Sequence, residues 1–172
     1  MQVDAKAILY MVAQQFGLKR DTTEDRLKLQ KTIYLLQANG LQLGYGFSWY
    51  RYGPYSQDLV QDAYLVLRAE SDKYENETSS WKFNDNSLKR FAEFRSICTD
   101  ISNIRSDILD YAEQLELVAS VDFLKQTWYP KAGDEEVISG FKQRKKQLYR
   151  GNGITDEMIR KALHICEKLR VN

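Results

Sequence analysis

Apolar side chains recur every three or four residues through most of this chain, and that spacing restricts the fold more than any other feature of the sequence. Residues at this spacing share one face of an α-helix, where they can be buried together. Only 2 Pro and 9 Gly occur among the 172 residues, so few positions interrupt helices. Clear stripes are Val3, Ala7, Ile8, Met11 and Val12; Leu29, Ile33 and Leu36; and Ile159, Leu163, Cys166 and Leu169. The pattern predicts a mainly helical protein.

Turn and capping residues divide the chain into separate helices. Gly17 and Gly40 predict the ends of the first two, because glycine adopts the left-handed conformation that follows many helices. Thr22 or Thr23 is suited to cap the start of the second helix. Later helices are expected to begin after Ser56, from Ser87, before Ile108, at Asp134 and at Thr155.

The segment Gly44–Tyr52 departs from the helical spacing. Tyr45, Phe47 and Trp49 alternate there with smaller or polar residues, which is the period of a β-strand. The dipeptide Gly53–Pro54 should then turn the chain sharply. We therefore expect one strand in the N-terminal half, with about half of its rings buried.

A second departure lies between Ser71 and Asp85, where Trp81 and Phe83 alternate with polar residues. This alternation predicts a short hairpin. The expected fold is mainly α (α+β): a compact helical domain with a small antiparallel sheet, one strand plus a hairpin, in its N-terminal half. The length suits one domain, or an N-terminal subdomain at 1–85 with an all-helical subdomain at 86–172 packed on it.

Composition narrows the range of partners and compartments. The net charge of +1 gives no overall attraction to nucleic acid or an anionic membrane. No stretch approaches the roughly 20 apolar residues of a membrane span. The first apolar run has no basic segment ahead of it, so we expect no signal peptide. Cys98 and Cys166 lie far apart on apolar stripes, as buried free thiols of a reducing cytoplasm would.

The residue patterns of common catalytic sites are missing from the sequence. The single histidine, His164, is two residues from Cys166 and therefore points to a different helix face, so we expect no metal site. No phosphate-binding glycine loop and no Gly-x-Ser-x-Gly elbow occurs. The sequence favours a protein that is not an enzyme and needs no cofactor.

The aromatic segment offers candidates for a binding surface. If one face of the strand is buried, the other rings lie against a second layer or face solvent, where Tyr and Trp commonly anchor partners. The candidate partner-binding residues are Lys28, Lys31, Trp49, Tyr50, Arg51, Tyr52 and Tyr55. Lys28, Gln30 and Lys31 should lie beside Leu29, where they could bind a partner or remain solvated.

A basic run from Lys142 to Arg150 is the other charged feature. Its sign would suit phosphates. Acidic residues 134–136 open the same helix, however, and acids at the start with bases at the end are what a helix dipole favours. A solvated helix face is the simpler interpretation.

The N-terminal half resembles the Panacea (SocA-like) antitoxin domain and the related YwgA-like bacterial proteins. The residues that carry the resemblance are Lys28, Leu29, Gln30, Lys31, Ile33, Tyr34, Leu35, Leu36, Phe47, Tyr52, Gly53, Pro54, Tyr55, Ser56 and Leu59. The second half resembles the YwgA-like group more weakly, through Glu116, Leu117, Ala119, Phe123, Leu124, Lys145 and the last helix. The resemblance implies a mostly helical bacterial or phage module with a small sheet. It further implies an antitoxin, which neutralises a toxin or acts as an adaptor for its removal, and it offers no catalytic residue.

Two hypotheses follow for the function. The first is a regulatory protein whose tyrosine surface, rimmed by Lys28, Lys31 and Arg51, docks on another protein and masks its active surface. The alternative is a winged-helix-like nucleic-acid binder with Lys73 and Lys82 on the wing. The near-zero net charge and the lack of a basic recognition helix weigh against the alternative.

Overall fold

Most of the chain is helical, and a short β-hairpin is the exception. The computed structural model describes residues 4–105, 107–144 and 153–170. Its helices are α1 (Ala5–Phe16), α2 (Thr23–Ala38), α3 (Gln57–Tyr64), a π-helical turn (Leu65–Ala69), α4 (Ser71–Thr78), α5 (Asp85–Ser102), α6 (Tyr111–Thr127), α7 (Asp134–Arg144) and α8 (Asp156–Leu169). The strands are β1 (Ser48–Tyr50) and β2 (Gly53–Tyr55). The predicted mainly helical class with a small antiparallel sheet is confirmed.

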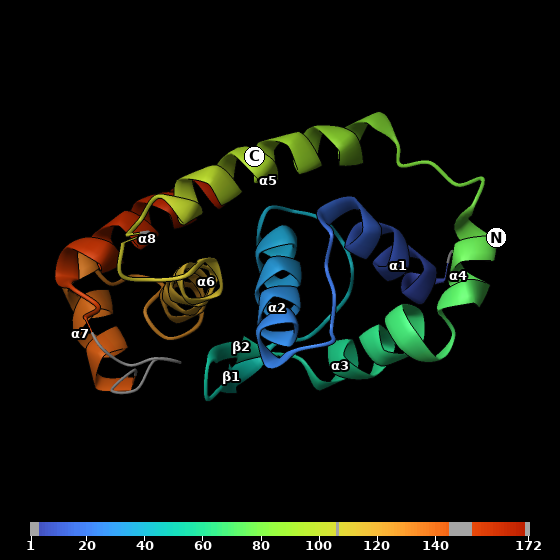
Figure 1. The fold of residues 1–172 in the computed structure, drawn as a ribbon. Helices are drawn as coiled ribbons and strands as arrows, with labels where there is room; N and C mark the ends of the chain where they lie inside the picture. The colour runs from blue at the N-terminus through green and yellow to red at the C-terminus, as the bar shows by residue number, and fades with distance from the viewer. Residues whose placement is uncertain (1–3, 106, 145–152, 171–172) are drawn as a thin grey trace.

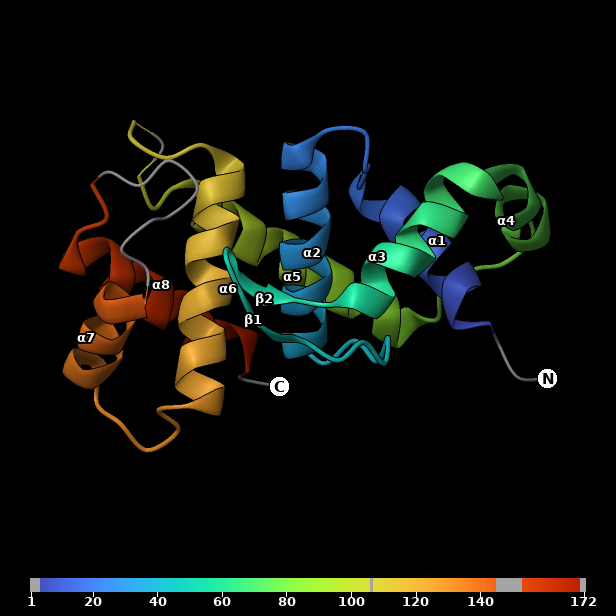
Figure 2. The ribbon, with the colours of Figure 1, turned by 90° about the horizontal axis from the view of Figure 1, so that it is seen from below.

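Helix α2 lies in the middle of the molecule. Helices α1, α3 and α4 lie on one side of it, and α6, α7 and α8 lie on the other, while α5 runs past both groups (Figures 1 and 2). The hairpin lies where α2 and α6 run alongside each other, and β2 packs on both helices. The hairpin therefore rests on two buried helices.

Helix α6 is the most deeply buried element. Every residue from Ala112 to Leu124 is buried, polar ones included, because α2, β2, α5, α7 and α8 all pack against it. Asp110 caps its first turn, so the helix begins at Tyr111 and not before Ile108 as predicted. Ile108 consequently lies outside the helix and is exposed.

Local capping explains where the other helices begin. The Thr22 hydroxyl accepts a hydrogen bond from the Asp25 amide at 3.0 Å, and the Asp25 carboxylate accepts one from the Thr22 amide. This reciprocal capping box selects Thr22 over Thr23. Gly17 ends α1 in the left-handed conformation, and Ser56 and Thr155 cap α3 and α8, as predicted.

The sheet is smaller than the sequence predicted and differently placed. Ser48–Tyr50 pairs antiparallel with Gly53–Tyr55, with Trp49 opposite Pro54. The turn therefore falls at Arg51 and Tyr52, and Gly53–Pro54 belongs to the second strand. The aromatic segment builds its own hairpin instead of one longer strand.

The hairpin predicted between Ser71 and Asp85 is wrong. Residues 71–78 form α4, which packs on α1, and no strand follows before α5. Tyr74 and Thr78 are one turn apart and both buried, so the segment has a helical apolar face. Phe83, half-buried, packs its ring against Phe91 with centroids 4.7 Å apart, which accounts for the apolar residues that suggested a strand.

The structure describes both cysteines and the histidine, and part of the basic run. Cys98 and Cys166 are free thiols, half-buried and buried respectively, and His164 is exposed. The helix that was expected to contain the basic run is described up to Arg144. Val3, Lys145 and the rest of the basic run up to Arg150 lie outside the described residues.

Candidate binding site

The hairpin presents three tyrosines on one side. Tyr50 and Tyr55, from opposite strands, place their ring centroids 5.3 Å apart. Tyr50 is 56% exposed and Tyr52 is 36% exposed. Rings that remain this accessible in a folded protein are the kind of surface that anchors partners. About half of the rings were expected to be buried; Tyr45 is buried, whereas Phe47 and Trp49 are half-buried and pack against the core.

Two side chains of α2 fasten the hairpin to the helix. The Gln30 side-chain amide donates to the Ser56 carbonyl at 2.8 Å and accepts from the Ser56 amide at 2.9 Å. The Lys31 ammonium donates to the Pro54 carbonyl at 2.7 Å. Of the two alternatives for Gln30 and Lys31, a partner contact or a solvated position, the solvated position is therefore wrong. Both are buried, Lys31 to 2% exposure, because they satisfy backbone groups of the hairpin that would otherwise be buried without partners.

Gly53 brings the other side of the hairpin against α6. Its φ of +85° lies in the left-handed region, which side chains other than glycine's rarely adopt. A Cβ at this position would stand 2.2 Å from the Ser120 hydroxyl. Glycine is required here by the backbone conformation and by the close approach to α6.

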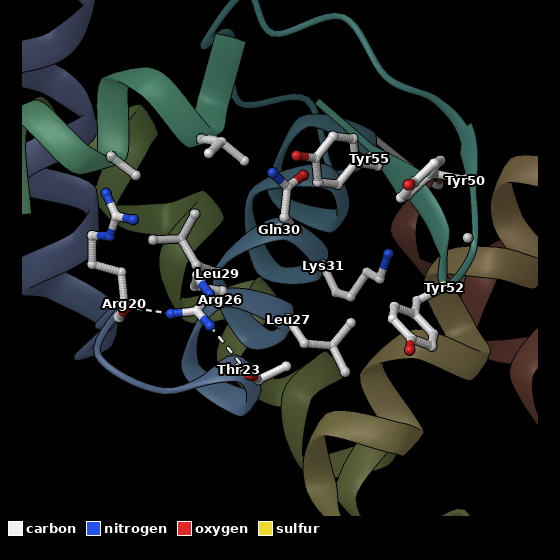
Figure 3. Close-up of a pocket in the computed structure, with 13 residues that line it drawn as sticks. Arg20, Thr23, Arg26, Leu27, Leu29, Gln30, Lys31, Tyr50, Tyr52 and Tyr55 are labelled. Atoms are coloured by element: carbon white, nitrogen blue, oxygen red, sulfur yellow. Dashed lines mark hydrogen bonds between the residues drawn. The ribbon is translucent and has the colours of Figure 1, made fainter. Parts of the chain in front are cut away.

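A pocket of about 320 Å³ lies between α2, the hairpin and α3. Figure 3 shows Tyr50, Tyr52 and Tyr55 on one side, Arg20 and Arg26 on the other, and residues of α2 between them. Leu27 and Leu29 of α2 and Val60 and Ala63 of α3 give it an apolar lining. This volume falls at the lower end of the roughly 300–1,000 Å³ typical of ligand pockets.

Among the described residues, those with a charge that line the pocket are all cationic: Arg20, Arg26 and Lys31. The Arg26 guanidinium donates to the Arg20 carbonyl at 3.3 Å and to the Thr23 hydroxyl at 3.1 Å. The Arg20 guanidinium lies over the Tyr64 ring, 4.9 Å from its centroid. Since no carboxylate of the described ranges lines the pocket, its interior favours groups that are apolar or negatively charged.

The other predicted partner-binding residues do not line this pocket. Lys28 pairs with Glu24 on the surface of α2 and borders a smaller pocket beside Cys98. Trp49 faces α6, where its ring packs on those of Phe123 and Trp128. Arg51 is exposed in the hairpin turn. Of the predicted set, the structure brings Lys31, Tyr50, Tyr52 and Tyr55 together.

Sequence reasoning missed the two arginines of the pocket. Arg26 lies one helical turn before Gln30, and Leu27 one turn before Lys31, so all four share one face of α2. That spacing is a signal that could have identified Arg26. Arg20 lies in the loop before α2, and nothing in the local sequence connects it with the tyrosines.

Outside the pocket, the buried carboxylate of Asp122 forms an ion pair. Asp122 is fully buried in α6, accepts a hydrogen bond from the Tyr34 hydroxyl at 2.7 Å, and pairs with both Nε and Nη2 of Arg170. Burial, reinforced by the neighbouring carboxylate, raises the pKa of Tyr34 well above its ordinary value. This cluster ties α2 and α6 to the residue that follows α8.

Comparison with known proteins adds no relative. No protein-family model, no curated protein and no solved structure matches the chain significantly. Within the described residues, no helix is both long and apolar enough to cross a membrane, and no three His, Cys, Asp or Glu side chains cluster as metal ligands would. The fold and the pocket define a mainly helical protein with one apolar, cation-lined pocket beneath exposed tyrosines.

Proposed function

We propose that this protein is a non-catalytic regulatory binding protein of the antitoxin type, which neutralises a toxin or serves as an adaptor in a bacterial toxin–antitoxin or phage-defence system. The observation that carries the proposal is the group of accessible tyrosines, Tyr50, Tyr52 and Tyr55, around an apolar pocket. The resemblance of residues 28–59 to Panacea antitoxin domains supports the antitoxin role, and the protein would act in the cytoplasm.

The mechanism is occlusion of a partner's active surface. The hairpin is fastened by buried hydrogen bonds to α2 and by a close contact to α6, so its tyrosines are held in place before any partner arrives. Preorganised side chains lose little conformational freedom on binding, which favours affinity. An interface centred here would bury on the order of 1,600 Å² in total.

The winged-helix alternative has no observation in its favour. Its expected wing, residues 71–85, is occupied by α4 and a loop. Lys73 lies on that helix and pairs with Glu70. A gel-shift titration over salt concentration tests it directly, since protein–nucleic-acid affinity falls steeply with added salt.

The test begins with the reading frame next to the gene. Its product is expressed alone and together with this protein, and growth is measured. We expect the product alone to arrest growth and co-expression to restore it. If the neighbouring product is harmless, or if co-expression does not restore growth, the antitoxin role is wrong.

Substitutions then locate the interface. Tyr50→Ala with Tyr52→Ala should abolish rescue, because truncation of a central tyrosine anchor typically costs ~2 kcal/mol or more of binding free energy. Leu88→Ala is the matched control: it removes an exposed large apolar side chain from α5, which does not line the pocket. Equal rescue by both variants would place the interface elsewhere.

A further inference from the structure

The lining of the pocket beneath the tyrosines specifies what kind of partner segment it accepts. Leu27, Leu29, Val60 and Ala63 supply an apolar interior. Burial of a large apolar side chain against such a lining is favourable by roughly 1.5–3 kcal/mol. The volume of about 320 Å³ accommodates a large side chain, so the first requirement on the occupant is an apolar group.

The arginines add a second requirement. The Arg20 Nη1 atom is buried and has no hydrogen-bond partner within the described part of the chain. Arg26 donates to a backbone carbonyl and to a hydroxyl, both of them neutral acceptors. A guanidinium forms its strongest hydrogen bonds with a carboxylate or phosphate, often in a bidentate manner. An anionic oxygen would therefore complement the two guanidiniums, which meet no carboxylate among the described residues that line the pocket.

The arrangement of the two features favours a protein segment over nucleic acid. Two arginines of the described part of the chain line the pocket, and the third cation, Lys31, already donates to the Pro54 carbonyl. Nucleic-acid backbones are commonly held by several phosphate contacts along a basic groove. The exposed rings of Tyr50 and Tyr52 flank the pocket, so an occupant that continues beyond it finds further apolar contact.

We infer that the pocket takes an acidic–apolar segment of the partner protein, with a large apolar side chain between the tyrosines and α2 and an adjacent Asp or Glu carboxylate on Arg20 and Arg26. The inference rests on the proposed function for the existence of a protein partner. It adds the chemical class of the segment that this partner presents.

The experiment selects peptides on the full-length protein without assuming a partner. A random linear peptide library displayed on phage is panned against the immobilised chain. Enriched peptides should place Leu, Phe, Trp or Tyr within two positions of Asp or Glu. Enriched peptides without acids, or no enrichment at all, would overturn the inference.

The best enriched peptide, labelled with fluorescein, is then titrated by fluorescence anisotropy. Arg20→Gln with Arg26→Gln should weaken it at least about tenfold, as expected for the loss of charge-assisted hydrogen bonds. A peptide with the acid replaced by its amide should bind about tenfold more weakly to the natural protein, and the arginine substitutions should hardly affect it further. The double change Lys89→Gln with Lys161→Gln is the control for charge, since both lysines are exposed on α5 and α8.

Three further results separate the inference from the proposed function. If Tyr50→Ala abolishes rescue while the arginine variants rescue normally and bind the peptide normally, the function stands and the acidic specificity is wrong. If peptides behave as expected but the neighbouring product is harmless, the pocket chemistry stands and the antitoxin role falls. If labelled oligodeoxythymidine binds the natural protein, binds the arginine variant more weakly, and no peptide is enriched, the occupant is nucleic acid. Thermal unfolding confirms that each variant is folded. If Arg20→Gln with Arg26→Gln is not folded, Arg20→Lys with Arg26→Lys replaces it in the same measurements.

Discussion

Replacement of Gly53 by alanine is the sharpest test of how the hairpin is seated. The added Cβ would meet the Ser120 hydroxyl oxygen at 2.2 Å and the Ser120 Cβ at 3.2 Å. The residue would also keep a φ of +85°, which suits glycine. The substitution thus combines a steric overlap with an unfavourable backbone conformation.

Each of the two penalties has a known order of magnitude. A left-handed backbone costs an alanine about 1–2 kcal/mol. Overpacking of a buried contact costs about 1–3 kcal/mol. Gly53→Ala should therefore lower the free energy of unfolding by about 2–5 kcal/mol, a large part of the roughly 5–15 kcal/mol that native proteins possess.

Ser120→Ala removes the overlapping oxygen and leaves the backbone strain. The Ser120 hydroxyl is buried and has no hydrogen-bond partner within the described residues, so its loss alone should change stability by less than about 0.5 kcal/mol. In the double variant the steric cost largely disappears, which predicts a coupling free energy of about 1–2 kcal/mol.

Urea unfolding of the four proteins of this cycle, followed by far-UV circular dichroism, measures these quantities. Gly46→Ala is the control, because a Cβ there meets nothing within 4 Å and the residue has no positive φ. It should be neutral or stabilising by up to about 1 kcal/mol. If Gly53→Ala and Ser120→Ala combine additively within about 0.5 kcal/mol, the contact between the hairpin and α6 is not as described.

Three other predictions concern the buried polar groups. Arg170→Met should lower the free energy of unfolding by about 2 kcal/mol or more, because it leaves the fully buried Asp122 carboxylate without its cationic partner. The control Lys168→Met breaks an exposed ion pair and should cost less than about 1 kcal/mol. Equal losses in urea unfolding would contradict this. Because folding raises the pKa of Tyr34, the contribution of its neutral hydroxyl to stability is complete below about pH 10 and is lost as pH rises further. The free energy of unfolding should therefore fall above about pH 10, and the fall should be shallower in Tyr34→Phe. The same pH dependence in both proteins would refute the prediction. Burial raises the pKa of the Cys166 thiol, so a thiol-specific reagent should label Cys166 only as the protein unfolds. Rapid labelling of the native protein would contradict the packing of α8 against the core.

The helical elements could be predicted because they depend on local chemistry. The stripe Ile159, Leu163, Cys166 and Leu169 is buried as expected, and Thr155 caps its helix. These features involve residues three or four positions apart, which the sequence displays directly. The helix predicted to begin before Ile108 begins at Tyr111, because Asp110 caps it and Asp is among the strongest helix-start residues.

The errors come from contacts between distant segments. The alternation of Trp81 and Phe83 resembled a strand, yet these residues pack as a loop near α5, and the preceding segment became α4 through burial of Tyr74 against α1. The partners of Lys31 and Arg20 also depend on tertiary structure, since the hairpin carbonyl and the Tyr64 ring lie 23 and 44 positions away in the chain. Local spacing carries no information about such pairs.

The burial of Gln30 and Lys31 changes which residues report on partner binding. A two-stranded hairpin leaves one edge of each strand without backbone partners. Along β2, the Gln30 amide and the Lys31 ammonium bond to Ser56 and Pro54 as the next strand of a sheet would. Substitution of either residue would move the hairpin and its tyrosines together, so a loss of binding would reflect hairpin position. Changes at exposed side chains that leave the Gln30 and Lys31 hydrogen bonds in place, such as Tyr50, can distinguish contact with a partner from support of the surface that the partner contacts.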